Sequence, residues 1–458
     1  MFIPKLIQVT EEAKDDALTT EYLVRCRSIN PKVKVVYVKN SKPELPAHLD
    51  AAGRYHHMKE TLLICRRSSS FIETFESPGH IVERMSTMVK SVFNCSSSCE
   101  FCYLGKTALR QQHQKLYSNI DVIEQEMLNE IPIHIGLNTI LSAYAFYNES
   151  PLLKIPPGFK KFADEFRNKL SRMGKNKISQ EDVSKYINDN LAEILLKLDV
   201  PLAQQQYFNI KKQLPSYFAE NKKFDVSFNI GEYTDIGAID HISGHLKFFA
   251  DLVEKHKNIK INFMSKSPNL TSLLKAQCDN RVLVTIGFNP QSVIDKYEHG
   301  TYSLKERIAA AKKVQKKGDI NLKLEIEPII FIPNYEKEYI KLIRKLLKEL
   351  DVNKISKITM GGIRLAADYR GIIPQYFPDT DLLDMHMEKP DVSYDRYRYP
   401  LEERVDIYLK LIAEIKNHCD CEIGLGAETP ELWEAINFDA AKAMSKNFFQ
   451  YLDPNGDE

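Results

Sequence analysis

Alternating apolar and polar positions predict a series of β-strands along the second half of the chain. The clearest of them cover residues 224–230, 259–264, 281–288, 322–328 and 355–360. The segments between them carry apolar residues at the spacing of an α-helix, so strands and helices follow one another in turn. This order predicts an α/β fold of parallel βαβ units wound into a full or partial barrel. Catalytic groups of such a barrel lie at the carboxyl ends of its strands.

One predicted helix carries both of its end signals. Ser303 and Glu306 form a capping box ahead of an apolar stripe, and Gly318 is placed to end the helix. Helical patterns also cover residues 182–198 and begin near residue 122.

The pattern divides the chain into four parts. Residues 1–86 mix short strands with polar loops and predict a small N-terminal α/β lobe. Residues 87–370 contain the alternating strands and helices that predict the barrel. Residues 132–222 are rich in Lys, Asn and Gln and predict a helical insertion between the first two barrel strands. It either shapes the substrate entrance or serves packing alone. Residues 371–458 are expected to form a C-terminal extension.

Composition excludes several classes of protein. The chain has 458 residues, of which 43% are hydrophobic and 27% charged, as in an ordinary globular enzyme. Its net charge of +1 leaves no chain-wide basic field for nucleic acid, so phosphate binding would need a local patch. No apolar stretch reaches the roughly 20 residues that span a bilayer. We therefore expect a cytoplasmic protein with no membrane partner.

Three of the eight cysteines, Cys95, Cys99 and Cys102, lie on one short segment. A disulfide framework is not expected in a long cytosolic chain. Three thiolates on one loop can bind three irons of a [4Fe–4S] cluster and leave the fourth iron open to another ligand.

Other metal sites stay open as alternatives. A zinc knuckle would need His113 or a distant residue as its fourth ligand. Cys419 and Cys421 form a Cys-x-Cys pair, which is either a second metal site or two structural thiols.

Several segments carry a family resemblance. The loop reads CSSSCEFCY over residues 95–103, with CxxxCxxC spacing and an aromatic residue before the third cysteine. Further matching segments are FIPKL at 2–6, LYSNID at 116–121, TDI at 234–236, IDH at 239–241, YEHGT at 297–301 and LKERI at 304–308. Together these segments resemble the spore photoproduct lyase family, a DNA-repair branch of the radical S-adenosylmethionine (SAM) enzymes.

The resemblance implies a partial (β/α)6 barrel with a [4Fe–4S] cluster on Cys95, Cys99 and Cys102. It implies SAM as cofactor and reductive cleavage of SAM to a 5′-deoxyadenosyl radical, which abstracts hydrogen from a substrate. An electron donor such as flavodoxin or ferredoxin would then be a partner.

Carried over position by position, the resemblance gives roles to further residues. Phe101 would pack near the cluster and the adenine of SAM, and Lys266 would bind the SAM carboxylate. Thr234 and Thr285 would place hydroxyl groups beside SAM. Tyr103 would match a tyrosine implicated in radical relay. The ordinary alternatives are a solvated lysine, threonines bonded to nearby backbone, and a tyrosine packed in the core.

Glu232 stands where the family has a cysteine that donates a hydrogen atom. It lies two residues before Thr234-Asp235, and Asp240-His241 follow. A carboxylate does not donate a hydrogen atom as a thiol does, because its O–H bond is far stronger. The sequence therefore predicts that Glu232 contacts SAM or acts as an acid or base on a substrate. A structural ion pair is the alternative.

Candidate substrate contacts lie towards the C-terminus. Arg364 follows the strand at 355–360 and could hold an anionic group. Arg396 and Arg398 belong to the Tyr- and Arg-rich segment 394–400, which could contact bases and phosphates or form a packed loop. Glu325 and Glu327 share one strand face, which we expect to face the barrel lumen.

Three functions remain in view from the sequence. The first is a radical SAM enzyme, similar to spore photoproduct lyase, that acts on a nucleobase, nucleotide or DNA without thiol-mediated repair. The second is a radical SAM enzyme that modifies a peptide or another small metabolite. The third is a non-catalytic iron–sulfur or zinc protein that binds DNA.

Overall fold

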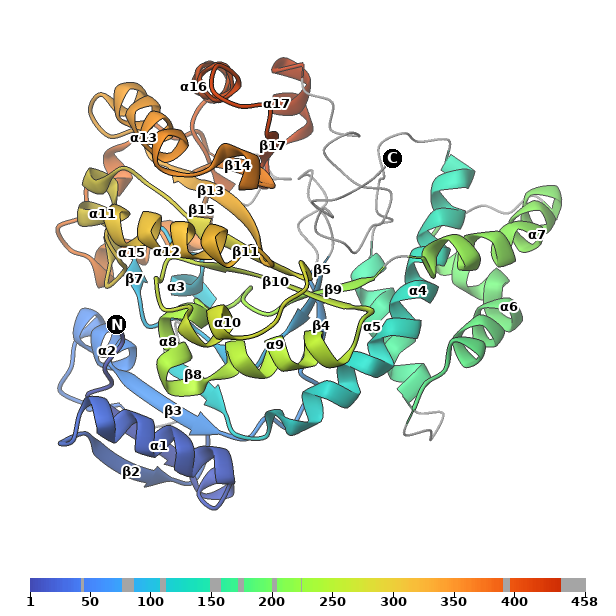
Figure 1. Ribbon diagram of the computed structural model, residues 1–458, viewed down its shortest axis with the longest axis horizontal. Helices are drawn as coiled ribbons and strands as arrows, with labels where there is room; N and C mark the ends of the chain where they lie inside the picture. The colour runs from blue at the N-terminus through green and yellow to red at the C-terminus, as the bar shows by residue number, and fades with distance from the viewer. Residues whose placement is uncertain are drawn as a thin grey trace.

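Two β-sheets organise the structure, a computed structural model that describes residues 1–42, 45–75, 86–107, 113–148, 158–171, 177–199, 204–223, 225–389 and 396–437. The smaller sheet builds an N-terminal lobe, and the larger sheet builds a partial barrel (Figure 1). Four helices on the side of the barrel away from the lobe form the insertion. The predicted α/β class and partial barrel are confirmed.

The lobe sheet has five strands in the order β2-β1-β3-β8-β6. They are β1 (Leu6–Thr10), β2 (Lys34–Val38), β3 (Thr61–Cys65), β6 (Val92–Phe93) and β8 (Gln114–Tyr117). All pairings are parallel except that of β6 with β8. Strands β6 and β8 of this sheet lie beyond residue 86, one before and one after the cysteine loop. The lobe sheet therefore holds both ends of that loop.

Helices connect the lobe to the barrel. η1 (Glu11–Ala13), α1 (Ala17–Ile29) and α2 (Ala51–Lys59) belong to the lobe. Buried Tyr22 and Cys26 of α1 share one hydrophobic cluster with Ile239 and Ile242 of the barrel helix α8 (Ile236–Ser243). The lobe and the barrel thus bury a common apolar surface.

The barrel sheet has the strand order β17-β14-β13-β11-β10-β9-β5-β4. Its strands are β4 (Ile72–Phe75), β5 (Ser86–Val89), β9 (Val226–Asn229), β10 (Ile259–Ser265), β11 (Val282–Gly287), β13 (Asn321–Ile329), β14 (Lys357–Gly362) and β17 (Glu422–Leu425). Strands β5 to β14 are the six parallel barrel strands. β17 adds a further parallel strand at one edge, and β4 adds an antiparallel one at the other.

Helices cover the outside of the barrel. The longer ones are α8, α9 (His245–Lys255), α11 (Gln291–Tyr297), α12 (Leu304–Lys317), α13 (Tyr335–Glu349) and α16 (Leu401–Lys416). The capping box of Ser303 and Glu306 is confirmed at the start of α12, and Gly318 ends that helix with φ +83°. A left-handed backbone of this kind suits glycine.

Short elements complete the barrel ends and the C-terminal part. They are β7 (Ser98–Cys99), α3 (Leu104–Thr107), η2 (Ile120–Val122), α10 (Thr271–Lys275), β12 (Glu298–His299), η3 (Val352–Lys354), β15 (Leu365–Ala366), α14 (Ala367–Arg370), α15 (Ile373–Tyr376), η4 (Leu382–Asp384), β16 (Arg396–Tyr397) and α17 (Pro430–Ala435).

The insertion has a hydrophobic core of its own. It contains α4 (Ile123–Asn148), α5 (Phe159–Ser171), α6 (Gln180–Lys197) and α7 (Gln204–Asn221), whose apolar faces form a separate cluster. The sequence predicts a helix near residue 122 and an insertion that begins at residue 132. The structure has one continuous helix there, α4, which passes through Pro132. Packing of α4 against α6 and α7 outweighs the roughly 3 kcal/mol that an interior proline costs.

Arg167, held by a buried ion pair within the insertion, ties the insertion to the edge of the barrel. Arg167 of α5 donates to Glu130 of α4 from Nε at 2.8 Å and also bonds Thr74 Oγ1 of β4. The side chains of Arg167 and Glu130 are 11% and 4% exposed. Burial opposes ionisation of Arg167, but Glu130 outweighs that effect and raises the pKa of the guanidinium.

Removing one member of this pair should leave a buried, uncompensated charge. We expect Glu130→Ala to lower the free energy of unfolding by about 3 kcal/mol. Asp251→Ala is the control, because Asp251 pairs with Lys247 on the exposed side of α9 and should contribute less than about 1 kcal/mol. Urea unfolding of both variants measures the difference, and equal losses would contradict the anchoring role of Glu130.

Candidate active site

The cysteine loop is fixed between the lobe and the barrel. Strand β7, which contains Cys99, pairs antiparallel with β12, so that Cys99 lies opposite Glu298. From the lobe, Lys59 Nζ donates to the carbonyl oxygen of Cys95 at 2.8 Å. Cys99 is buried, while Cys95 and Cys102 are half-buried. The backbone of the loop is therefore held from two sides before any ligand binds.

Glu100 attaches the same loop to the C-terminal part of the chain. One of its carboxylate oxygens lies 2.7 Å from His299 Nε2, and the other accepts a hydrogen bond from Thr380 Oγ1. Its backbone oxygen accepts from Tyr369 OH at 3.2 Å. At Gly105, an added Cβ would lie 2.1 Å from the Tyr369 hydroxyl, so only glycine lets this tyrosine approach. Sequence reasoning gave Glu100 no role beyond its place in the loop motif.

Glu298 is the centre of a buried charge cluster beside the loop. Its carboxylate accepts hydrogen bonds from Lys266 Nζ at 2.7 Å, from Asn289 Nδ2 at 2.8 Å and from Arg307 Nη2. The side chains of Glu298 and Arg307 are fully buried. Burial raises the pKa of Glu298, but Lys266 and Arg307 outweigh that effect and lower the pKa to about 2.

Lys266 lies at the carboxyl end of β10 and is not a solvated lysine, since its side chain is 14% exposed. Burial disfavours the ammonium, yet the charge of Glu298 outweighs burial and raises the lysine pKa. Its Nζ lies 5.1 Å from the centroid of the Phe101 ring. This cation therefore sits against the aromatic residue of the cysteine loop.

Residues 229–235 form the neighbouring wall at the end of β9. Asn229 Nδ2 donates to Glu232 Oε2 at 2.7 Å, and Tyr103 OH donates to the Glu232 carbonyl oxygen at 2.5 Å. The hydroxyl of Thr234 is buried and makes no hydrogen bond within the described part of the chain. Asp235 begins α8 and accepts hydrogen bonds from Ser265 Oγ at 2.6 Å and from the backbone N–H of Lys266 at 2.9 Å.

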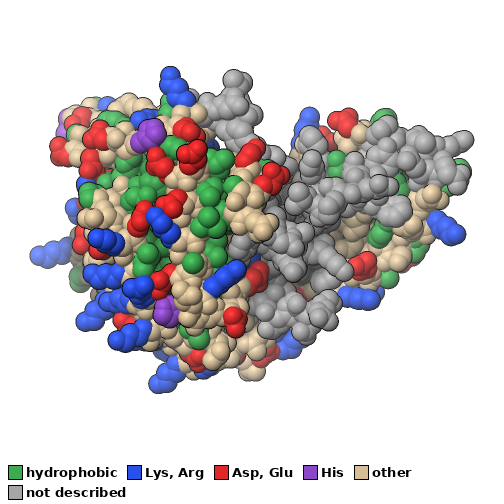
Figure 2. Space-filling model, turned by 90° about the horizontal axis from the view of Figure 1, so that it is seen from above, with side chains coloured by type: hydrophobic (Ala, Val, Ile, Leu, Met, Phe, Trp, Pro, Cys, Tyr) green, Lys and Arg blue, Asp and Glu red, His purple; other side chains and the backbone are tan. Residues whose placement is uncertain are grey.

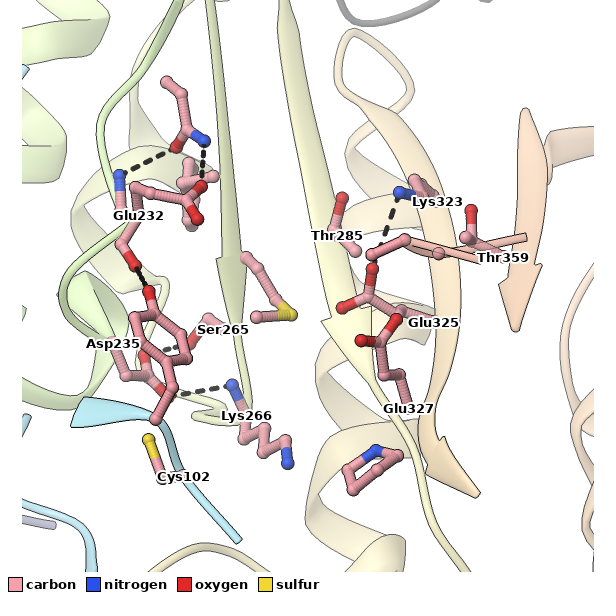
Figure 3. A pocket seen from close by; sticks show the side chains of 18 of the residues that line it. Cys102, Glu232, Asp235, Ser265, Lys266, Thr285, Lys323, Glu325, Glu327 and Thr359 are labelled. Atoms are coloured by element: carbon pink, nitrogen blue, oxygen red, sulfur yellow. Dashed lines mark hydrogen bonds and ion pairs between the residues drawn. The ribbon is translucent and has the colours of Figure 1, made fainter. Parts of the chain in front are cut away.

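A cavity of about 400 Å³ connects these groups. Every predicted site residue except Arg398 lines it: Cys95, Cys99, Phe101, Cys102, Tyr103, Glu232, Thr234, Lys266, Thr285, Arg364 and Arg396. Figure 3 shows Cys102, Glu232, Asp235, Ser265 and Lys266 along one side, and Thr285, Lys323, Glu325, Glu327 and Thr359 along the other. Sequence patterns that lie far apart in the chain thus meet in one space.

Arg364 is already neutralised in this cavity. It bonds Glu327 through Nη2 and donates to the Gly426 carbonyl oxygen at 2.9 Å. An anionic substrate group would have to displace Glu327 from it. Burial raises the pKa of Glu327, Arg364 opposes the shift, and Glu325 adds to it.

Arg398 lies outside the cavity, among buried groups. It is 5% exposed and approaches Glu428 Oε2 at 3.3 Å, and Arg404 donates to the same oxygen at 2.6 Å. Glu428 is fully buried and also accepts from Tyr408 OH at 2.7 Å. A buried carboxylate requires such cations, which explains why Arg398 turns inward. Tyr394 and Asp395 of the same segment lie outside the described residues.

Two further expectations concern metal sites and membranes. Among the described residues, no three His, Cys, Asp or Glu side chains converge on a point for one metal ion. Cys419 and Cys421 lie just before β17. Among the described residues, no third His, Cys, Asp or Glu side chain joins them as a possible metal ligand. No described helix has the length and apolar character that a membrane crossing requires.

Comparisons with known proteins agree with one another. A family model described as spore photoproduct lyase matches residues 200–420. The spore photoproduct lyase of Geobacillus sp. is 26% identical over 209 residues, 44% of this chain and 61% of that protein. That of Bacillus subtilis is 28% identical over 196 residues, 42% of this chain and 57% of that protein. The matched segment thus spans about three-fifths of the length of these curated relatives.

Solved structures extend the likeness over nearly the whole fold. A spore photoproduct lyase complexed with dinucleoside spore photoproduct matches 93% of this chain and 99% of its own, with a TM-score of 0.63 and 18% identity. A mutant with bound AdoMet and dinucleoside spore photoproduct matches 92% and 98%, with a TM-score of 0.61 and 18% identity. Residues 200–420 of this chain are thus similar in sequence to spore photoproduct lyases, and nearly the whole chain shares their fold. The family model reaches residue 420, past the last matching segment noted in the sequence.

The low pKa of Glu298 predicts how stability depends on pH. The carboxylate stabilises the folded state fully above its ordinary pKa of 4.5, and this contribution is lost as the pH falls towards about 2. Unfolding free energies of metal-free wild type and Glu298→Gln should therefore differ by a constant amount above about pH 5 and converge below it. A difference that does not shrink in acid would contradict the ionic role of Glu298.

Proposed function

We propose that this chain is a radical SAM enzyme that abstracts a hydrogen atom from a nucleobase, a nucleotide or DNA. The single observation that carries the proposal is that the three-cysteine loop opens into the same cavity as Lys266, Glu232 and Thr234. The solved relatives with AdoMet and dinucleoside spore photoproduct have the same fold.

The residues present fit a [4Fe–4S] cluster. Burial raises the pKa of the Cys102 thiol, and also that of Cys99, so a bound cation such as iron is needed to keep these thiols ionised. In a [4Fe–4S] cube each cysteine binds a different iron, and Cys95, Cys99 and Cys102 are three free thiols on one loop that line the same cavity. When bound, the cluster and SAM supply a 5′-deoxyadenosyl radical by reductive cleavage of SAM.

The residues along the same wall fit SAM. Lys266 offers a buried ammonium for the SAM carboxylate, and Phe101 beside it offers an apolar ring face. Thr234 offers a buried hydroxyl with no hydrogen bond among the described residues, which suits a polar atom of SAM. Glu232, oriented by Asn229, offers a carboxylate to the SAM ammonium or to a substrate proton. Tyr103 is fixed by its hydrogen bond to the Glu232 backbone and borders the cavity.

Repair of a thymine photoproduct through a thiol is not part of the proposal. The only cysteines among the described residues that line the cavity are Cys95, Cys99 and Cys102, which are assigned to the cluster. By the resemblance, Glu232 stands where the family has its donor cysteine, and a carboxylate does not donate a hydrogen atom as a thiol does. The group that returns a hydrogen atom to the substrate radical would therefore differ from that in the family's repair reaction.

On the described part of the face seen in Figure 2, both basic and acidic side chains are exposed. We place the enzyme in the cytoplasm, where all eight cysteines stay reduced and a flavodoxin or ferredoxin supplies electrons.

SAM cleavage is the first prediction of the proposal. Anaerobically reconstituted wild type, given dithionite and SAM, should form 5′-deoxyadenosine, and Cys99→Ala should lose at least about 99% of it because the cluster lacks a ligand. Cys419→Ala, outside the cavity, is the matched control and should keep wild-type formation. Equal formation in the two variants would reject the proposal, and DNA binding without any SAM cleavage would favour a non-catalytic iron–sulfur protein.

SAM binding without reductant tests the wall residues separately. Thr234→Val keeps the shape of the side chain and removes the hydroxyl, so we expect the SAM dissociation constant to rise about fivefold. Lys266→Met should raise it further because a charged partner is lost. Thr20→Val on the exposed face of α1 should bind SAM as wild type does. Isothermal titration calorimetry measures all four proteins, and unchanged affinity in Thr234→Val would remove Thr234 from the SAM site.

A further inference from the structure

The half of the cavity that faces away from the cysteine loop is lined by charged and polar side chains. Closed eight-stranded barrels are filled by layers of branched apolar side chains, whereas this partial barrel leaves a cavity. β13 directs Lys323, Glu325 and Glu327 inward from alternate positions, and Thr359 of β14 joins them. The lumen therefore offers charged and polar groups to a ligand.

Glycines on the adjoining strands leave room for these side chains. A Cβ added at Gly361 would lie 2.3 Å from Glu327 Oε2, and one at Gly426 would lie 2.2 Å from the same atom. A Cβ at Gly424 would lie 2.5 Å from Lys357 Cε. Three positions that could have carried filling side chains are thus kept small, and the charged groups occupy the space.

Ion pairs place cations and carboxylates side by side in this half. Glu325 Oε1 lies 3.6 Å from Lys323 Nζ, Glu422 Oε1 lies 2.8 Å from Lys357 Nζ, and Glu327 is bonded to Arg364. A ligand in the lumen therefore meets ammonium or guanidinium groups next to carboxylates. Such a lining suits a polar edge that presents a hydrogen-bond acceptor beside a donor.

One polar atom in this wall lacks a partner. Thr359 is 6% exposed, lines the cavity, and its Oγ1 makes no hydrogen bond within the described residues. Buried hydroxyls are normally satisfied, so this atom points to a polar ligand in the lumen. By the strand register, Thr359 lies opposite Glu325.

We infer that the lumen half of the cavity binds a guanine-type nucleobase edge, with Lys323 as donor and Glu325 as acceptor. The inference rests on the proposed function and narrows its substrate. Guanine presents one carbonyl oxygen beside two N–H groups that point the same way, which matches an ammonium next to a carboxylate. Thymine presents a second carbonyl oxygen in place of the amino group and would set it against the carboxylate. The lumen thus discriminates against the base from which the family's photoproduct is made.

Equilibrium binding of two dinucleotides tests this assignment. The probes are d(GpG) and d(TpT), titrated into the reconstituted protein saturated with SAM and kept without reductant, so that no cleavage occurs. Wild type should bind d(GpG) at least about tenfold more tightly than d(TpT). This difference in affinity is what one good bidentate contact to a base provides. Glu325→Gln replaces the carboxylate acceptor by an amide with its own N–H groups. The affinities for d(GpG) and d(TpT) should then differ by no more than about twofold.

Controls separate this test from folding and from the proposed function. Glu254→Gln, on the exposed face of α9, should keep the wild-type preference. SAM affinity of Glu325→Gln should stay at the wild-type level, because Lys266 and Glu232, the charged groups proposed to bind SAM, lie along the other side of the cavity. Equal or tighter binding of d(TpT) by wild type, binding of neither dinucleotide, or an unchanged preference in Glu325→Gln would each overturn the inference. Formation of 5′-deoxyadenosine after dithionite is added to a portion of the same preparation reports on the proposed function independently.

Discussion

The site depends on one buried carboxylate, that of Glu298. It forms ion pairs with two buried cations, Lys266 and Arg307, and its strand β12 pairs with the strand that contains Cys99. An unpaired charge at this depth would cost several kcal/mol. The ion cluster, the cysteine loop and the end of β10 are therefore positioned together, although they come from three distant parts of the chain.

Local signals in the sequence predicted the elements and the loop chemistry. The capping box at Ser303 and the stop at Gly318 depend on neighbouring residues alone, and CxxxCxxC spacing is likewise local. The partners of Glu298 could not be predicted, since no local pattern records which cation a distant carboxylate meets. For Arg398, composition left a substrate contact and a packed loop open, and the burial of Glu428 determines where its guanidinium points. The passage of α4 through Pro132 likewise depends on tertiary packing.

The cavity combines two walls of different character. The wall beside the cysteine loop carries a buried cation, an unpartnered hydroxyl and an aromatic ring, and it resembles a site for a charged cofactor. The opposite wall carries ion pairs in spaces kept open by glycines. Since fold alone does not determine chemistry, the polar lumen is the feature that sets this chain apart from a closed barrel filled by apolar side chains.

The central claim is that Cys95, Cys99 and Cys102 hold a [4Fe–4S] cluster with one iron open to SAM. Mössbauer spectroscopy of the anaerobically reconstituted protein, with and without SAM, tests it most directly. The account predicts about four irons per chain, with the signal of one changing when SAM is added and the signals of the other three unchanged. A single bound metal ion, or four irons whose signals are all unchanged when SAM is added, would contradict it.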